Sequence, residues 1–137
     1  MTDPAAPYWT IEYLESGESV PGGPFTVFIG DGEEDGRSLD LQCMPDEPDE
    51  QSVRLELDSY CIVSEGGGVH YGGLEEVALR PDRLLLRFTD EAVGELELPS
   101  REVVLGVARG IGVEELRTGL RKVLSYGNPE KVPTMSL

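Results

Sequence analysis

The sequence is poor in the residues that build metal centres and disulfide frameworks. It contains one histidine and two cysteines among 137 residues. A structural zinc site needs about four Cys or His ligands, and Cys43 and Cys61 are too few for a disulfide-stapled fold. We therefore expect two reduced thiols, no metal and no cofactor.

Long hydrophobic runs and a basic, apolar leader are also missing. No segment approaches the ~18 consecutive apolar residues of a membrane span, and we expect no signal peptide. The composition, 39% hydrophobic and 28% charged, is typical of a globular chain. We expect a cytoplasmic protein with a single domain over residues 1–137, of which residues 1–8 and 130–137 are flexible.

Positive charge is scarce in the first half of the chain. Residues 1–69 hold 16 acidic side chains against only Arg37 and Arg54, whereas residues 70–137 hold 11 acidic and nine basic side chains. The net charge of −16 repels nucleic acid and anionic membranes and attracts basic proteins. The sequence therefore predicts a basic protein partner, although an acidic surface can also serve solubility alone.

Two β-hairpins are predicted from alternating apolar residues. In residues 25–43, two such runs flank a segment rich in turn residues, and their register places Ile29 opposite Leu39. In residues 74–89, a turn at Pro81 and Asp82 separates two leucine-rich runs. The other expected facing pairs are Val27 with Leu41, Leu79 with Leu84, and Val77 with Leu86.

Residues 52–64 are predicted to form one long extended segment. Val53, Leu55 and Leu57 alternate, so we expect them to point to the core. Continuing the alternation brings Cys61 to the same face. This segment is interpreted as a central strand covered on both faces beyond residue 58.

Three glycines at 66–68 are expected to turn the chain into a short strand over residues 69–71. Tyr60 and Tyr71 would then lie near one another as a cross-strand aromatic pair. His70 falls beside Val63 or Ser64, depending on the length of the turn.

Helices are predicted at two places. Thr89 is suited to cap a short helix that begins with Asp90 and Glu91. Residues 113–126 repeat apolar side chains at helical spacing, with acids early and bases late. With strands over residues 9–14 and 101–108, the expected fold is α+β: a mainly antiparallel β-sheet of hairpins with a C-terminal amphipathic helix packed on one face.

No enzyme signature accompanies these elements. Cys61 and His70 on neighbouring strands would be the one pair resembling a nucleophile and a base, but Cys61 sits in an apolar strand, the setting of an inert thiol. The glycines at 66–68 are not a phosphate loop, since no lysine follows. We expect a binding protein and not an enzyme.

The segment DSYCIVSEGGGVHYGGLEEV, followed by the leucine-rich hairpin and a final helix VEELRTGLRKVL, resembles the immunity protein 10 family of bacterial polymorphic-toxin systems. The resemblance covers roughly residues 50–126. It implies a small cytoplasmic protein that binds and neutralises a toxin made or delivered by the same or a sibling cell.

Acidic loops and exposed aromatic residues are the candidate toxin contacts. The carboxylates would steer the protein onto a basic surface, and a nuclease toxin fits this sign best because its nucleic-acid groove is cationic. The spacing of the acids is not that of a calcium-binding loop. The candidate residues are Asp31, Glu33, Glu34, Asp35, Asp46, Glu47, Asp49, Glu50, Tyr60, His70 and Tyr71.

Two other functions fit the same residues. An acidic secretion or assembly chaperone would also bind a protein without chemistry, and co-expression with a toxin separates it from an immunity protein. A small-ligand-binding module would be centred on His70, and substitution of Cys61 and His70 by alanine would reveal it.

Overall fold

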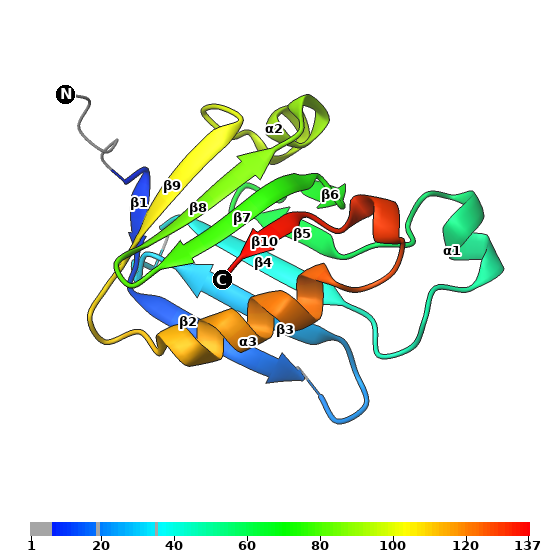
Figure 1. The fold of residues 1–137 in the computed structure, drawn as a ribbon, viewed down its shortest axis with the longest axis horizontal. Helices are drawn as coiled ribbons and strands as arrows, with labels where there is room; N and C mark the ends of the chain where they lie inside the picture. Colours follow the sequence, from blue (N-terminus) through cyan, green and yellow to red (C-terminus); the bar gives the residue numbers. More distant parts are fainter. Residues whose placement is uncertain (1–6, 19, 35) are drawn as a thin grey trace.

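Short turns and alternating strands produce two five-stranded β-sheets in the computed structural model, which describes residues 7–18, 20–34 and 36–137 (Figure 1). The first sheet has, in spatial order, β1 (Trp9–Ile11), β9 (Glu102–Val107), β8 (Arg83–Phe88), β7 (Leu74–Arg80) and β10 (Thr134–Ser136). The second sheet has β2 (Tyr13–Glu18), β3 (Phe25–Gly30), β4 (Ser38–Cys43), β5 (Cys61–Ser64) and β6 (Val69–Tyr71). The helices are α1 (Glu50–Arg54), α2 (Asp90–Leu96) and α3 (Val113–Leu124), followed by a short 3₁₀ turn (Pro129–Lys131).

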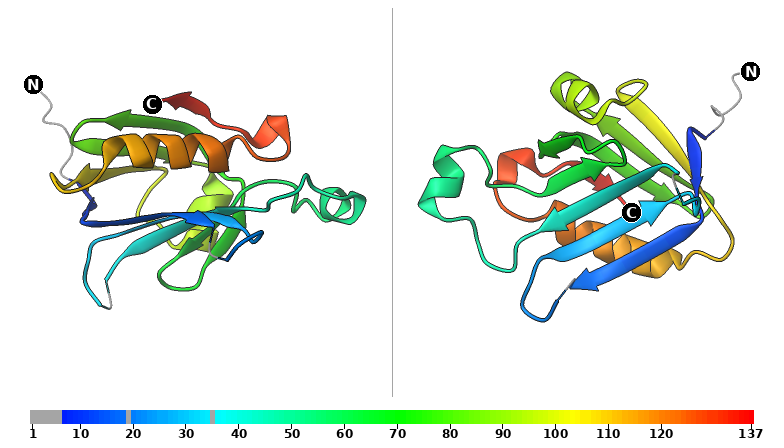
Figure 2. Two further views of the ribbon diagram at one scale, coloured as in Figure 1. Left: turned by 90° about the horizontal axis from the view of Figure 1, so that it is seen from below. Right: turned by 180° about the vertical axis from the view of Figure 1, so that it is seen from behind.

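The amphipathic helix α3 lies across the inner face of the second sheet, beside the first sheet (Figure 2). Its buried side chains join those of both sheets in one hydrophobic cluster. Gly119 lets the helix approach the sheet closely, because a Cβ at this position would lie 2.8 Å from Ser16 Oγ and from Val27 Cγ2. The core is thus formed by the two sheets and α3, with Ala92 and Leu96 of α2 added to it.

The α+β fold class and both hairpins are confirmed. Ile29 pairs with Leu39 and Val27 with Leu41, in the expected register. The β7–β8 hairpin likewise pairs Leu79 with Leu84 and Val77 with Leu86. Alternation and turn residues were sufficient to predict these two registers, because each hairpin has one buried face and a buried face fixes the register.

Both predicted helices are present and begin where expected, and α3 ends at Leu124, two residues before the predicted end. The side chain of Thr89 accepts a hydrogen bond from Ala92 N and caps α2. In α3 the apolar stripe is buried, and the acidic first turn and basic last turn complement the helix dipole. Strand β9 also forms where residues 101–108 were expected to be extended.

The long strand expected over residues 52–64 is wrong in its first half. Asp49 caps the short helix α1 by accepting a hydrogen bond from Ser52 N. The side chains expected in the core are solvent-exposed instead, by 53% for Val53, 58% for Leu55 and 39% for Leu57. These alternating apolar residues therefore form part of the surface and not of a buried strand. Strand β5 begins only at Cys61.

The ends of the described chain differ from the expected antiparallel arrangement. The strand predicted over residues 9–14 is broken at Glu12, where the chain passes from the first sheet to the second. β1 pairs with β9 in parallel, and β10 pairs with β7 in parallel. Residues 130–137, expected to be a loose tail, thus contribute an edge strand.

Leu120 tests the packing of α3 against the second sheet. Its side chain is fully buried, so Leu120→Ala leaves a cavity and is expected to lower the free energy of unfolding by about 2–5 kcal/mol. Leu85→Ala, on a side chain that is 37% exposed, is the matched control and should cost less than about 1 kcal/mol. Urea unfolding measures both; equal costs would contradict the placement of α3.

Candidate functional site

The two predicted acidic groups lie at opposite ends of the second sheet. Asp31, Glu33 and Glu34 occupy the turn between β3 and β4, beside the Gly30–Ser38 pair. The acidic run 46–50 follows the other end of β4 and begins α1 (Figure 1). Asp35 lies outside the described residues. The two groups therefore do not form one continuous patch.

The carboxylates of both groups are free of ion pairs with the protein's own bases, as far as residues 7–18, 20–34 and 36–137 are concerned. Among the ion pairs of second-half bases, Arg87 pairs with Glu76 and Arg101 with Glu75, whereas Lys131 pairs with Asp58 of the first half. Backbone N–H groups hold the pKa of Asp31 and of Asp49 below the usual value. Both turns therefore project negative charge into solvent.

The register of β5 and β6 separates residues that the sequence had suggested as partners. Tyr71 pairs with Cys61 and His70 pairs with Ile62, so Cys61 and His70 point to opposite faces of the sheet. The pairing expected for His70 with Val63 or Ser64 is therefore wrong. Burial raises the pKa of the Cys61 thiol, which favours the neutral form. This geometry contains no nucleophile and base within reach of each other.

Tyr60 is fully buried and does not pair with Tyr71. Its hydroxyl accepts a hydrogen bond from Leu74 N at 3.0 Å and donates one to the Lys131 carbonyl at 3.1 Å. Burial raises the pKa of Tyr60 to about 12. Tyr60 is thus a structural residue inside the fold and not a surface contact.

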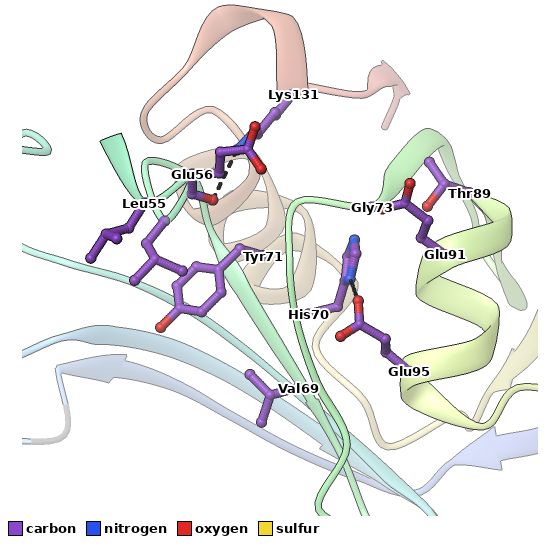
Figure 3. Close-up of a pocket in the computed structure, with 11 residues that line it drawn as sticks. Leu55, Glu56, Val69, His70, Tyr71, Gly73, Thr89, Glu91, Glu95 and Lys131 are labelled. Carbon is purple, nitrogen blue, oxygen red and sulfur yellow. Dashed lines mark hydrogen bonds and ion pairs between the residues drawn. The ribbon is translucent and has the colours of Figure 1, made fainter. Parts of the chain in front are cut away.

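A groove of about 710 Å³ surrounds His70, between β6, α2 and the segment that follows α1 (Figure 3). His70 Nδ1 lies 2.5 Å from Glu95 Oε1 on α2. Gly73, at φ +96°, leaves room for the imidazole, because a Cβ there would lie 2.5 Å from His70 Cδ2. Lys131 closes one side and donates from Nζ to Asp58 Oδ1 at 2.9 Å.

Exposed apolar side chains line the same groove. Leu55 and Leu57 follow α1, and Val69 and Tyr71 on β6 are 43% and 37% exposed. In Figure 3, Tyr71 and Val69 point away from α2, whereas His70 points toward Glu95. The acidic run 46–50 leads through α1 into this apolar surface, so one end of the molecule combines negative charge with exposed hydrophobic side chains.

Several residues of this groove were not found from the sequence. Glu91 and Glu95 come from α2, and Lys131 comes from the 3₁₀ turn. A local signal in the sequence existed only for the exposed leucines. Asp49 and Ser52 have the spacing of a helix N-cap, and a helix that begins there argues against a strand at Leu55 and Leu57.

Metal binding and membrane crossing have no support in the described part of the chain. No group of three His, Cys, Asp or Glu side chains there is placed to hold a metal ion. No helix among these residues is long and apolar enough to cross a bilayer. The lining of the groove combines apolar side chains with carboxylates, the imidazole of His70 and the ammonium of Lys131.

Comparison with known proteins gives one family. The profile of the family described as immunity protein 10 matches residues 17–110. No curated protein and no solved structure matches the chain significantly. The matched range contains the acidic turns, α1, the β5–β6 hairpin and α2.

The ion pair between Lys131 and Asp58 predicts a pH-dependent stability. The hydrogen bond from Lys131 holds the pKa of Asp58 below its usual value. The pair therefore stabilises the fold fully above the unfolded-state pKa of about 3.9, and this contribution is lost as the pH falls through the lower folded-state pKa. We expect Lys131→Met to reduce the free energy of unfolding more at pH 7 than at pH 3.

Urea unfolding at the two pH values measures this difference. Lys122→Met is the control, because Lys122 lies over the Phe25 ring at 4.5 Å and takes part in none of the ion pairs among the described residues. If Lys131→Met lowers the free energy of unfolding equally at both pH values, the aliphatic stem of Lys131, and not its charge, provides the stabilisation.

Proposed function

Since the chain belongs to the immunity protein 10 family, we propose that it neutralises a basic toxin by binding it through its acidic surface. The observation that carries this proposal is the exposed carboxylate run 46–50, which has no ion-pair partner among the described residues and adjoins exposed apolar side chains. Charge at a rim with apolar contacts beside it is the usual anatomy of a protein interface.

The charge distribution supports a role in association. A net charge of −16 acts over distances of about a Debye length and orients a cationic partner before contact. Such steering can raise association rates from about 10⁵–10⁶ to about 10⁸ M⁻¹s⁻¹. An immunity protein that must capture a toxin before it acts gains directly from a fast association.

A nuclease is the toxin class that fits this surface best. The active groove of a nuclease is cationic because it binds phosphates. Carboxylates on the inhibitor can take the place of those phosphates without any chemical step. The absence of a nucleophile–base pair at Cys61 and His70 agrees with inhibition by occupation.

Co-expression tests the function itself. Toxin domains encoded next to the gene are expressed in a sensitive bacterium with and without this chain. We expect one of them to arrest growth alone and to be neutralised when the chain is present. Survival that depends on export of the toxin, and not on its inhibition, would support a secretion chaperone instead.

The acidic run predicts a salt-dependent association rate. Asp46→Asn with Glu47→Gln removes two charges beside α1, and Glu33→Gln with Glu34→Gln removes two charges at the other end of the sheet. We expect the first pair to slow association about tenfold at low salt and to flatten its salt dependence. The second pair should have a much smaller effect.

Stopped-flow or surface-binding kinetics measure the association rate of both variants with the toxin domain that co-expression identifies. Asp49 is left unchanged because it caps α1. Equal slowing by the two pairs would mean that net charge alone matters, and an unchanged rate for the first pair would remove the run from the interface.

A further inference from the structure

Strand β6 is the edge of the second sheet, and its outer hydrogen-bonding groups face away from the sheet. Ser64 N donates to Gly68 O at 2.9 Å and Gly72 N donates to Tyr60 O at 2.8 Å. Hydrogen-bonded pairs alternate in an antiparallel ladder, so His70 bonds to β5 while the N–H and C=O groups of Val69 and Tyr71 point away from it.

These outward groups have no partner within the described residues. No hydrogen bond outside the β5–β6 ladder involves the backbone of Val69 or Tyr71 among residues 7–18, 20–34 and 36–137. Both residues are also exposed. An uncovered strand edge of this kind can pair with an extended segment of another chain.

The surroundings of this edge differ on its two sides. On one side lie the exposed apolar side chains of Leu55, Leu57 and Tyr71. On the other side lie the carboxylates of Glu91 and Glu95, both on exposed residues of α2 (Figure 3). An added strand alternates its side chains between two faces, so it meets apolar surface with one set and negative charge with the other.

Resting on the proposed function, we propose that the toxin docks by laying an extended segment along the edge of β6, with alternating apolar and basic side chains. The basic side chains lie toward Glu91 and Glu95, and the apolar side chains cover Leu55, Leu57 and Tyr71. The acidic run 46–50 at the same end of the molecule supplies the steering. Backbone pairing with the edge of β6 thus sets the register of the toxin segment, and the side-chain contacts select which segment binds.

Charge decides between the toxin and a second copy of this chain as the occupant. Pairing two β6 edges would bring two molecules of charge −16 together, with Glu91 and Glu95 of each copy beside the contact. Like charges at such a distance oppose association. A cationic segment has the complementary sign.

Proline tests the edge directly. Proline has no N–H, and it is tolerated on an edge strand where that group faces outward. Val69→Pro removes an outward donor and leaves the β5–β6 ladder intact, whereas Val69→Ala keeps the donor and shortens the same side chain. We expect Val69→Pro to weaken binding of the toxin domain found by co-expression at least tenfold, and Val69→Ala at most threefold.

Titration calorimetry measures both affinities, with urea unfolding as the check that Val69→Pro is folded. Equal affinities for the two variants overturn the proposal. Amide hydrogen exchange of the unaltered protein provides the second measurement, which needs no variant. We expect the Val69 and Tyr71 amides to exchange quickly in the free protein and slowly in the complex.

Each other outcome has a defined meaning. Unchanged exchange of both amides in a complex that still neutralises the toxin overturns the edge pairing and leaves the immunity function intact. Slow exchange already in the free protein, together with a dimeric mass by light scattering, assigns the edge to a second copy and also overturns the proposal. If no toxin domain is neutralised, the proposed function itself fails.

Discussion

The buried hydroxyl of Tyr60 joins three parts of the chain that are far apart in sequence. It accepts the N–H of Leu74, at the start of β7, and donates to the carbonyl of Lys131, just before β10. A buried donor or acceptor left without a partner costs about 1–3 kcal/mol, so this arrangement fixes how β5, β7 and the C-terminal segment meet. One side of the groove depends on it, because Lys131, whose carbonyl accepts a hydrogen bond from Tyr60, also lines the groove and pairs with Asp58.

The predictable part of the fold is the part in which local pattern and burial agree. Ile29 opposite Leu39 follows from alternation around one turn, and the α3 stripe follows from helical spacing. The exposed residues Val53, Leu55 and Leu57 alternate just as well, yet they lie outside the core because the Asp49 cap starts a helix before them. The parallel pairs of β1 and β10 could not be predicted, since they depend on strands that are distant in sequence.

The candidate site also has one part that the sequence predicts and one part that only tertiary packing creates. The acidic run 46–50 is visible in composition alone, and the lack of ion pairs between it and other described residues agrees with the scarcity of bases in the first half of the chain. Glu95 beside His70, and Lys131 beside Asp58, are brought together only by the packing of α2 and of the C-terminal segment. The alternation counted from Val53 placed Cys61 on the core face, whereas Tyr60 and Ile62 are the buried residues, because α1 breaks the alternation.

The change of sheet at Glu12 has a consequence for the kinetics of folding. β1 belongs to the first sheet and β2 to the second, so the pairing of Trp9 with Leu105 closes a loop that spans most of the chain. The entropy of closing so long a loop must be overcome before that contact contributes, whereas the β3–β4 and β7–β8 hairpins need only short loops. Refolding is therefore expected to be slow for a domain of this size, with the hairpins formed early and the N-terminal strand docking last.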